Sequence, residues 1–297
     1  MLKFKPLTLD DIDKIRPYFF HSINRTCDNS VGGTFMWRDY FSVEYAEWND
    51  NLIFKVKIKY HNDVTAFATP LGKDIKGSVN EIAEYCSFNK IPIAFCTATE
   101  KDAAIYAGIF KSIKTINDPD WNDYLYRAED LITLSGRRYS GQRNHINFFK
   151  KTYENYSFEV ICNENISEVK SFYDSVVSDV ESGSAIFREE HNKTLEVLDN
   201  YNKYRLPGGL IRVDKEVVAF AIGEAINDTL FVHVERANIM YRGAYQMIMN
   251  LFPAHYATPE IKFINREEDV GDEGLRNAKN ALHPVEIIKK HTVIVDG

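Results

Sequence analysis

The stretch Val217-Val218-Ala219-Phe220-Ala221 repeats, at an offset of 153 positions, the earlier stretch Val64-Thr65-Ala66-Phe67-Ala68. A second match lies in the same order at nearly the same offset. Residues 165–173 place apolar side chains at helical spacing as residues 11–19 do. Two matches at one spacing favour an internal duplication over chance. We therefore predict that the chain consists of two related halves.

The elements around the repeated stretches follow the same order in both halves. A strand precedes each stretch and forms a hairpin with it, and a helix and a short apolar strand come afterwards. The predicted ranges are 52–58, 64–68, 79–89 and 91–95 in the first half, and 209–213, 217–221, 244–252 and 261–264 in the second. This order is typical of an α+β fold, in which helices flank a mixed, mostly antiparallel sheet. We place one domain at residues 1–135, a basic connector with a linking helix at 136–153, and a second domain at 154–297.

The composition excludes several classes of protein. The 297 residues include 36 Lys and Arg against 43 Asp and Glu, which gives a formal net charge of −7. Such a chain is not a dedicated binder of duplex DNA, because those proteins rely on basic contacts to phosphates. The sequence contains no apolar run of about 18 residues, so we predict no membrane span. The first residues lack the apolar stretch of a signal peptide, so we predict none.

The cysteines and the acidic residues do not predict a metal site. The four cysteines are scattered without a C-x-x-C pair, so we expect reduced thiols and a cytoplasmic protein. The acidic run at residues 267–273 lacks the ligand spacing of a calcium loop. We expect these carboxylates to cap the helix that follows them.

A strand, a turn and a helix follow one another between residues 229 and 252. Alternate side chains of a strand share a face, so Phe231, His233 and Glu235 are predicted to lie together. The turn leads into the helix through Arg242-Gly243-Ala244-Tyr245. Unpaired amides and the helix dipole attract anions at such a place, and glycine lets the backbone approach closely. We predict an anion-binding loop here, with an ordinary strand-to-helix turn as the alternative.

This loop resembles the acyl-donor loop of the GNAT acyltransferase superfamily, where an Arg/Gln-x-x-Gly-x-Gly/Ala pattern cradles the pyrophosphate of coenzyme A. The sequence departs from that pattern at Tyr245, which stands where the superfamily has a small residue. This bulky residue favours a related family whose donor is not coenzyme A.

The wider pattern is similar to such relatives. Segments 208–213, 218–224, 233–237, 263–271 and 274–279 resemble the cytosolic C-terminal domain of lysylphosphatidylglycerol synthases and the free-standing bacterial proteins grouped with it. The resemblance covers most of the chain and implies two tandem GNAT-like domains, as in the Fem-type peptidoglycan aminoacyltransferases.

Aminoacyl transfer, which this resemblance implies, uses an ester that is already activated, so positioning and charge stabilisation supply most of the rate. His233 and Glu235 are the candidates for a base that deprotonates the acceptor. Arg266 is the candidate for neutralising a developing charge or holding a phosphate, and its neighbour Asn265 is a candidate contact for the substrate. The structural alternatives are a hydrogen-bonded core histidine for His233 and an ion pair of Glu235 with Arg236.

The connector gathers basic side chains in an otherwise acidic protein. They are Arg137, Arg138, Arg143, His145, Lys150 and Lys151. We interpret the first four as contacts for a phosphate-bearing substrate, either the acceptor end of a tRNA or an anionic lipid headgroup, with Tyr139 and Phe148 as stacking surfaces. The alternative is a solvated helix start whose charge is balanced by Glu129 and Asp130.

The sequence thus predicts an acyl-group transferase. The leading function is transfer of an aminoacyl group from charged tRNA to an amine or hydroxyl acceptor, such as a lipid headgroup or a peptide. One alternative is transfer from acetyl-coenzyme A to a small amine, and another is a non-catalytic relative that binds a ligand. Aminoacyl-tRNA or acetyl-coenzyme A would be the donor substrate, and no other cofactor is predicted.

Overall fold

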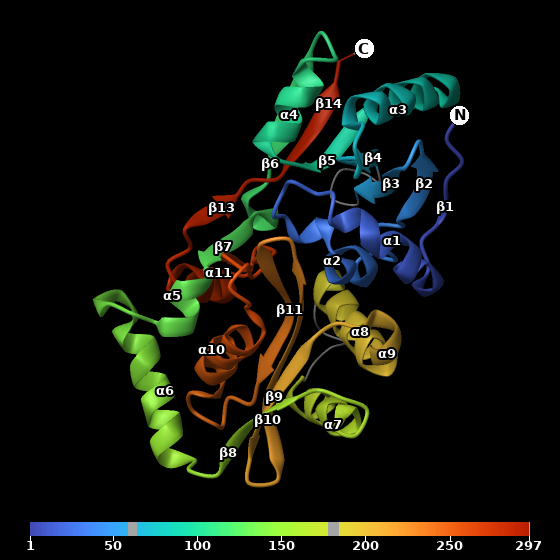
Figure 1. Cartoon of the computed structure of the whole chain (residues 1–297). Coiled ribbons are helices and arrows are strands. Elements are labelled where there is room, and N and C mark those ends of the chain that lie inside the picture. The colour runs from blue at the N-terminus through green and yellow to red at the C-terminus, as the bar shows by residue number, and fades with distance from the viewer. Residues whose placement is uncertain (59–63, 178–183, 297) are drawn as a thin grey trace. The chain divides into compact units, whose positions relative to one another are not determined.

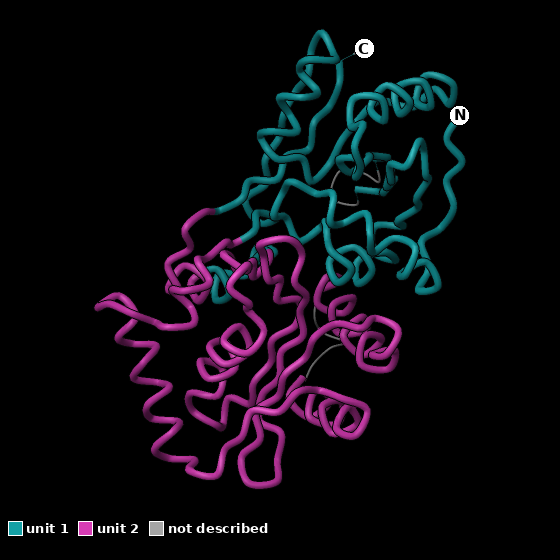
Figure 2. The backbone as a smooth tube through the Cα atoms, in the orientation of Figure 1, with its two compact units in different colours: residues 1–123, 268–276, 287–297 teal, residues 124–267, 277–286 magenta. Residues whose placement is uncertain are grey.

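The computed structural model describes residues 1–58, 64–177 and 184–296. The chain forms two compact units, which Figure 2 draws in two colours. Unit 1 comprises residues 1–123, 268–276 and 287–297, and unit 2 comprises residues 124–267 and 277–286. Each unit contains one seven-stranded sheet with helices packed around it.

The sheet of unit 1 has the order β1-β2-β3-β4-β5-β14-β6 (Figure 1). Its strands are β1 (Lys5–Pro6), β2 (Glu44–Trp48), β3 (Asn51–Ile58), β4 (Val64–Ala68), β5 (Ala94–Ala98), β14 (His291–Val295) and β6 (Ile113–Asn117). The pairing of β4 with β5 is parallel and the other pairings are antiparallel. The helices are α1 (Ile12–Phe19), α2 (Val31–Met36), α3 (Ile75–Asn89) and α4 (Glu100–Ala107). The core of this unit contains Ile53, Phe67, Phe95 and Val293, which come from four of these strands.

The sheet of unit 2 has the order β13-β7-β12-β11-β10-β9-β8. Its strands are β13 (Glu286–Ile288), β7 (Asp123–Arg127), β12 (Phe263–Asn265), β11 (Thr229–Ala237), β10 (Glu216–Ile226), β9 (Gly208–Val213) and β8 (Tyr156–Val160). The helices are α5 (Ala128–Thr133), α6 (Ser140–Thr152), α7 (Ile166–Val176), α8 (Ala185–Asp199), α9 (Tyr201–Tyr204) and α10 (Ala244–Tyr256), while α11 (Glu273–Asn280) begins in unit 1 and ends in unit 2. Helix α10 covers one face of this sheet and α7 the other (Figure 1). Of the helices in the described part of the chain, none is long and apolar enough to cross a membrane.

The two sheets have equivalent strand orders and exchange one strand. In unit 1 the first five strands follow the chain, and the sixth place is taken by β14 from the far end of the sequence. In unit 2 the five strands β8 to β12 follow the chain, and the sixth place is taken by β7, which precedes them. Each sheet is therefore completed by a strand from the other half of the chain.

The predicted elements are present, with shifted ends. Helix α3 begins at Ile75 because the Asp74 side chain accepts a hydrogen bond from the amide of Gly77, which caps the helix. Helix α10 continues to Tyr256, beyond the predicted end at residue 252. The short strands after these helices begin two or three residues later than predicted. The predicted domain boundaries at residues 135 and 153 stay a prediction about the duplicated halves, because the compact units follow the exchanged sheets.

Candidate functional site

The predicted site residues of unit 2 lie where two parallel strands separate. Strands β11 and β12 pair only through Thr229, Leu230 and Phe231, which face residues 263–265. Strand β11 then continues to Ala237, whereas β12 ends at Asn265. His233 and Glu235 on β11 and Arg266 after β12 therefore lie beside this opening.

Arg266 and Glu235 form a buried ion pair at the opening. The Nη2 atom of Arg266 lies 2.8 Å from Oε1 of Glu235, and each side chain is only 7% exposed. Burial raises the pKa of Glu235, although the positive charge of Arg266 opposes that rise. Nη2 also donates to the hydroxyl oxygen of Tyr245 at 3.3 Å. The second terminal nitrogen of the guanidinium, Nη1, is buried without a hydrogen-bond partner among the described residues.

The pairing of Glu235 corrects one alternative drawn from the sequence. Glu235 binds Arg266 rather than its neighbour Arg236, which instead contacts Oε1 of Glu190 on α8. Successive residues of a strand point to opposite faces, so an ion pair between Glu235 and Arg236 is geometrically unfavourable. A buried arginine nitrogen with no protein partner is suited to a carbonyl or phosphate oxygen of a ligand.

His233 is held between two carboxylates. Its Nε2 lies 2.9 Å from Oε1 of Glu224, and its Nδ1 lies 2.7 Å from Oε1 of Glu267. Burial alone lowers the pKa of this histidine, but the two carboxylates outweigh that effect and raise the pKa to about 10. At neutral pH the ring is therefore charged, and both nitrogens donate. This environment matches the structural alternative for His233, a hydrogen-bonded core histidine. A catalytic role of His233 stays a prediction.

The raised pKa of His233 predicts a dependence of stability on pH. Its folded pKa of about 10 exceeds the ordinary value of 6.5, so the folded state holds one more proton between these pH values. The stabilisation from His233 is complete below pH 6.5 and is lost as the pH rises toward 10, by about 1.4 kcal/mol per pH unit. Urea unfolding of the wild type and His233→Gln should show a difference in free energy that shrinks from pH 7 to pH 10. A difference that stays constant over this range would contradict the charged histidine.

The turn before α10 packs against α6 of the same unit. Gly243 has a φ of +92°, and a Cβ added to it would lie 2.5 Å from the carbonyl oxygen of His145 and 3.0 Å from Cβ of Phe149. The guanidinium of Arg242 lies 4.4 Å from the centre of the Phe148 ring. The amide of Ala244 donates to the carbonyl of Tyr241 at 2.9 Å, and Tyr245 is 37% exposed. The glycine therefore serves close packing of α6, and the role of this loop in binding an anion stays a prediction.

The connector side chains have different environments. Arg138 forms an ion pair with Asp130 at 2.8 Å, as the alternative reading of the connector expected. Arg143 donates to the carbonyls of Leu134 and Gly136, the latter at 2.7 Å, and thereby fixes the bend before α6. Arg137 is exposed. Of the four predicted connector contacts, Arg137 is the one left most open to a substrate.

Tyr139 and Asn265 are both buried, and the role of Asn265 in binding a substrate stays a prediction. Tyr139 is fully buried, and its hydroxyl donates to the carbonyl of Leu282, so it offers no stacking surface. Asn265 is also buried, and its Oδ1 accepts from the amide of Glu267 at 2.6 Å. Asn265 thus shapes the turn that carries Glu267 toward His233.

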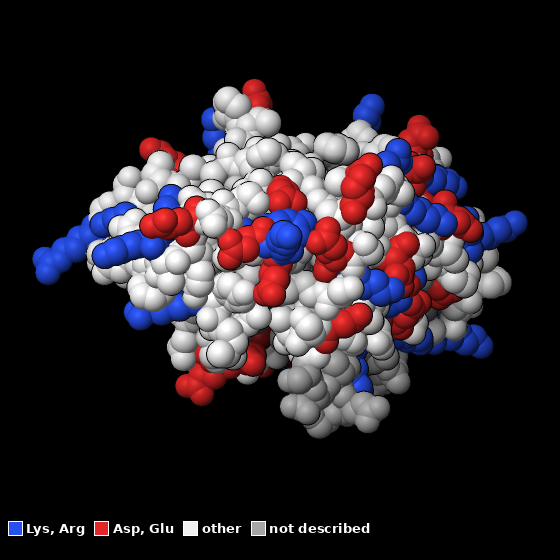
Figure 3. Space-filling view, turned by 90° about the horizontal axis from the view of Figure 1, so that it is seen from below, with Lys and Arg blue, Asp and Glu red and all other residues white. Residues whose placement is uncertain are grey.

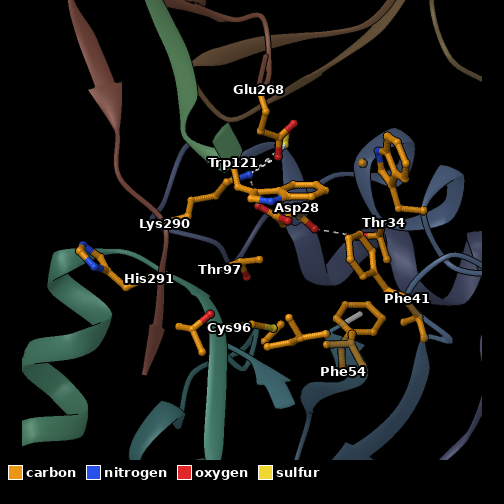
Figure 4. Close-up of a pocket in the computed structure, with 18 of the residues that line it drawn as sticks. Asp28, Thr34, Phe41, Phe54, Cys96, Thr97, Trp121, Glu268, Lys290 and His291 are labelled. Carbon is orange, nitrogen blue, oxygen red and sulfur yellow. Dashed lines mark hydrogen bonds and ion pairs between the residues drawn. The ribbon is translucent and has the colours of Figure 1, made fainter. Parts of the chain in front are cut away.

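Unit 1 contains a pocket that was not expected from the sequence. Its walls are aromatic and aliphatic side chains, and one end is charged (Figure 4). The empty space is about 1000 Å³, part of it open to solvent. The residues used below are Asp28, Trp37, Phe41, Phe54, Trp121, Glu268 and Lys290. These residues are far apart in the sequence, and no motif relates them.

Lys290 forms the centre of the charged end. Its ammonium lies 2.8 Å from Oδ1 of Asp123 and 2.9 Å from Oδ2 of Asp28, contacts Oε1 of Glu268, and lies 3.6 Å from Sγ of Cys27. Burial alone lowers the pKa of this lysine, but the carboxylates outweigh it and hold the pKa well above the usual range. Burial raises the pKa of Asp28 to about 6. Cys27, Asp123 and Glu268 are close enough together to share a metal ion, but in this arrangement Lys290 supplies the cation among them.

The acidic run at residues 267–273 does more than cap a helix. Asp272 accepts from the amide of Leu275 at 2.7 Å, as the capping prediction required. Glu267, however, binds His233, and Glu268 binds Lys290. Asp269 holds the guanidinium of Arg276. Of the five carboxylates in this run, Asp272 caps the helix and Glu273 lies in its first turn, whereas Glu267, Glu268 and Asp269 bind the cations named above.

Comparisons with known proteins show the family and the fold of the chain. A family model described as "Phosphatidylglycerol lysyltransferase, C-terminal" matches residues 21–294. An uncharacterized protein of Mycoplasmoides gallisepticum is 27% identical over 186 residues, and this match spans 62% of the chain and 59% of that protein's length.

Solved structures show the fold. A conserved protein of unknown function from Bacteroides thetaiotaomicron is 30% identical, with a TM-score of 0.90 and coverage of 100% of both chains. The C-terminal domain of a putative lysylphosphatidylglycerol synthetase from Agrobacterium fabrum is 13% identical, with a TM-score of 0.68 over 97% of this chain and 92% of that one. FemX is 8% identical, with a TM-score of 0.53 over 98% of this chain and 96% of that one.

These similarities and the two seven-stranded sheets confirm the prediction of an α+β fold with two tandem GNAT-like domains. Because the family model matches residues 21–294, the chain belongs to the family of the C-terminal domain of phosphatidylglycerol lysyltransferases.

Proposed function

We propose that this protein transfers an aminoacyl group from a charged tRNA to an amine or hydroxyl acceptor. The observation that carries the proposal is the buried Arg266, whose Nη2 binds Glu235 and whose Nη1 has no hydrogen-bond partner in the described part of the chain. It lies beside the opening between β11 and β12 in a chain of this family. A buried cation with unused donors is suited to the oxygen on which charge develops during acyl transfer.

The chemistry we propose uses two residues directly. As the acceptor attacks the ester carbon, Nη1 of Arg266 donates to the carbonyl oxygen and stabilises its negative charge. Oε2 of Glu235 takes the proton of the acceptor and passes it to the departing tRNA oxygen, so no net proton is gained or lost. The raised pKa of Glu235 favours this acceptance.

We assign His233 a positioning role instead of the role of base. Its two nitrogens hold Glu224 and Glu267, and Glu267 directly follows Arg266 in the chain. The charged imidazole therefore fixes the backbone that carries Arg266. This assignment is compatible with the high pKa of His233, because a base must be able to accept a proton near neutral pH.

The packing of the loop before α10 favours this donor over acetyl-coenzyme A. The carbonyl of His145 and the side chain of Phe149 occupy the space next to Gly243. In the GNAT loop that the sequence resembles, the corresponding glycine approaches a pyrophosphate. A small-amine acetyltransferase would require α6 to move away from this glycine.

The donor is tested by ligand-induced stabilisation and by label transfer. We expect charged tRNA to raise the melting temperature more than deacylated tRNA does, and acetyl-coenzyme A to leave it unchanged. Label from aminoacylated tRNA should then move into an organic-extractable lipid or a peptide product. Stabilisation by acetyl-coenzyme A alone would replace this proposal with the acetyltransferase alternative, and no response to any donor would favour a non-catalytic relative.

The connector is tested through the salt dependence of tRNA binding. Arg137, Lys150 and Lys151 are exposed on or before α6. The face drawn in Figure 3 carries both basic and acidic side chains. Replacing these three by Ala should weaken tRNA binding and reduce the slope of log K against log salt by about two, because each phosphate contact adds about 0.7–0.9. The control with the exposed residues Lys73, Lys76 and Lys101 changed to Ala loses the same charge. Equal slopes for the two variants would remove the connector from the binding surface.

A further inference from the structure

We propose that the pocket of unit 1 binds an organic ammonium ion, with the charged group against Asp28 and the apolar body between the aromatic walls. This inference is independent of the proposed transferase activity, because it concerns a separate cavity within unit 1 and is tested without tRNA.

The walls offer flat aromatic surfaces from separate segments of unit 1. Trp37 and Phe41 have ring centres 6.3 Å apart, and Phe41 and Trp121 have ring centres 5.9 Å apart in an edge-to-face arrangement. Phe54 closes the pocket from β3 (Figure 4). Aromatic faces attract cations through their quadrupole, most strongly for Trp, and they also bury the apolar part of a ligand.

The charged end has more negative than positive groups. Three carboxylates, from Asp28, Asp123 and Glu268, surround the single ammonium of Lys290. Two of the four groups are closed to a ligand, since the Lys290 side chain is 4% exposed and that of Asp123 is 0% exposed. The Asp28 side chain is 28% exposed and lines the pocket. An entering cation therefore meets a carboxylate first.

The same arrangement disfavours other classes of ligand. An anion would have to reach Lys290, whose ammonium is already contacted by three carboxylates. A metal ion would have to displace that ammonium from Asp123 and Glu268. An ammonium ion keeps this network and places its charge beside the accessible carboxylate of Asp28.

Three probes of similar size separate charge from shape. They are phenethylamine, which is cationic, 2-phenylethanol, which is neutral, and phenylacetate, which is anionic. Two of the three tryptophans, Trp37 and Trp121, line the pocket, so binding should change the intrinsic fluorescence. We expect phenethylamine to bind at least tenfold more tightly than the alcohol and the anion to bind weakest. Equal binding of amine and alcohol, or tighter binding of the anion, would overturn the proposal.

Variants locate the binding site, with calorimetry as the readout. Asp28→Asn should raise the dissociation constant of phenethylamine about tenfold and leave that of 2-phenylethanol nearly unchanged. Trp121→Leu should weaken both probes. Asp50→Asn makes the same chemical change in an exposed turn and should have no effect. If Asp28→Asn unfolds, Trp121→Leu and the comparison of the three probes on the wild type still test the proposal. Amine binding that Trp121→Leu leaves unchanged would place the ligand outside this pocket.

Discussion

Replacing Lys290 by Met should lower the free energy of unfolding by about 3–5 kcal/mol, because it leaves buried carboxylates without their cation. Asp123 is fully buried and Glu268 nearly so, and both contact the Lys290 ammonium. Their charges cannot return to water while unit 1 stays folded. Urea unfolding followed by circular dichroism measures the change.

The neighbouring residue provides the control for this substitution. Lys289 is exposed, so Lys289→Met should change the free energy of unfolding by less than about 0.5 kcal/mol. Adding Glu268→Gln to Lys290→Met should recover part of the loss, because one unpaired charge is removed. A loss below about 1 kcal/mol for Lys290→Met alone would mean that the network does not depend on its lysine.

Replacing Arg266 by Met should abolish most of the transfer activity. It should also lower the free energy of unfolding by about 3–5 kcal/mol, because Glu235 is left as a buried, unpaired charge. The double variant Arg266→Met with Glu235→Leu separates the two effects. An apolar pair of similar size often restores the stability of a buried ion pair. We expect its free energy of unfolding to return close to that of the wild type.

The activity of the double variant decides between a structural and a functional ion pair. If Nη1 of Arg266 stabilises the transition state, transfer should stay at least about 100-fold below the wild type, as when an oxyanion donor is removed. Arg236→Met is the matched control, since Arg236 lies next to Glu235 on β11 but pairs with Glu190. A stable double variant with wild-type activity would make the pair purely structural and would leave the proposed chemistry without its charge stabiliser.

The sequence predicts contacts within one strand better than contacts between distant segments. His233 and Glu235 could be placed together because the period of a strand is two residues, and Arg266 could be placed near them because it directly follows the next short apolar strand. The partners of these residues could not be found in the same way. Glu224 and Glu267 meet His233 only through the pairing and bulge of β10 and the turn after β12.

The pocket of unit 1 shows the same limit more strongly. Its charged end joins Cys27, Asp28, Asp123, Glu268 and Lys290, which no motif or spacing relates. Lys290 enters because β14 is inserted between β5 and β6. A duplicated sequence predicts two similar halves, but not that the halves exchange a strand. The sequence does contain one hint of this network. The run at residues 267–273 has more carboxylates than one helix terminus needs, so some of them could be expected to bind cations elsewhere.

The exchange of β14 and β7 constrains how the protein can fold while it is being synthesised. Residues 1–123 leave the ribosome early, but the gap between β5 and β6 is filled only when residues 291–295 have been made. Until then the nascent chain presents two unpaired strand edges, which can associate with other chains. Lys290 arrives with the same strand, so the buried carboxylates also lack their cation during this interval. Translation speed and chaperone supply should therefore affect the yield of this protein more than its final stability would suggest.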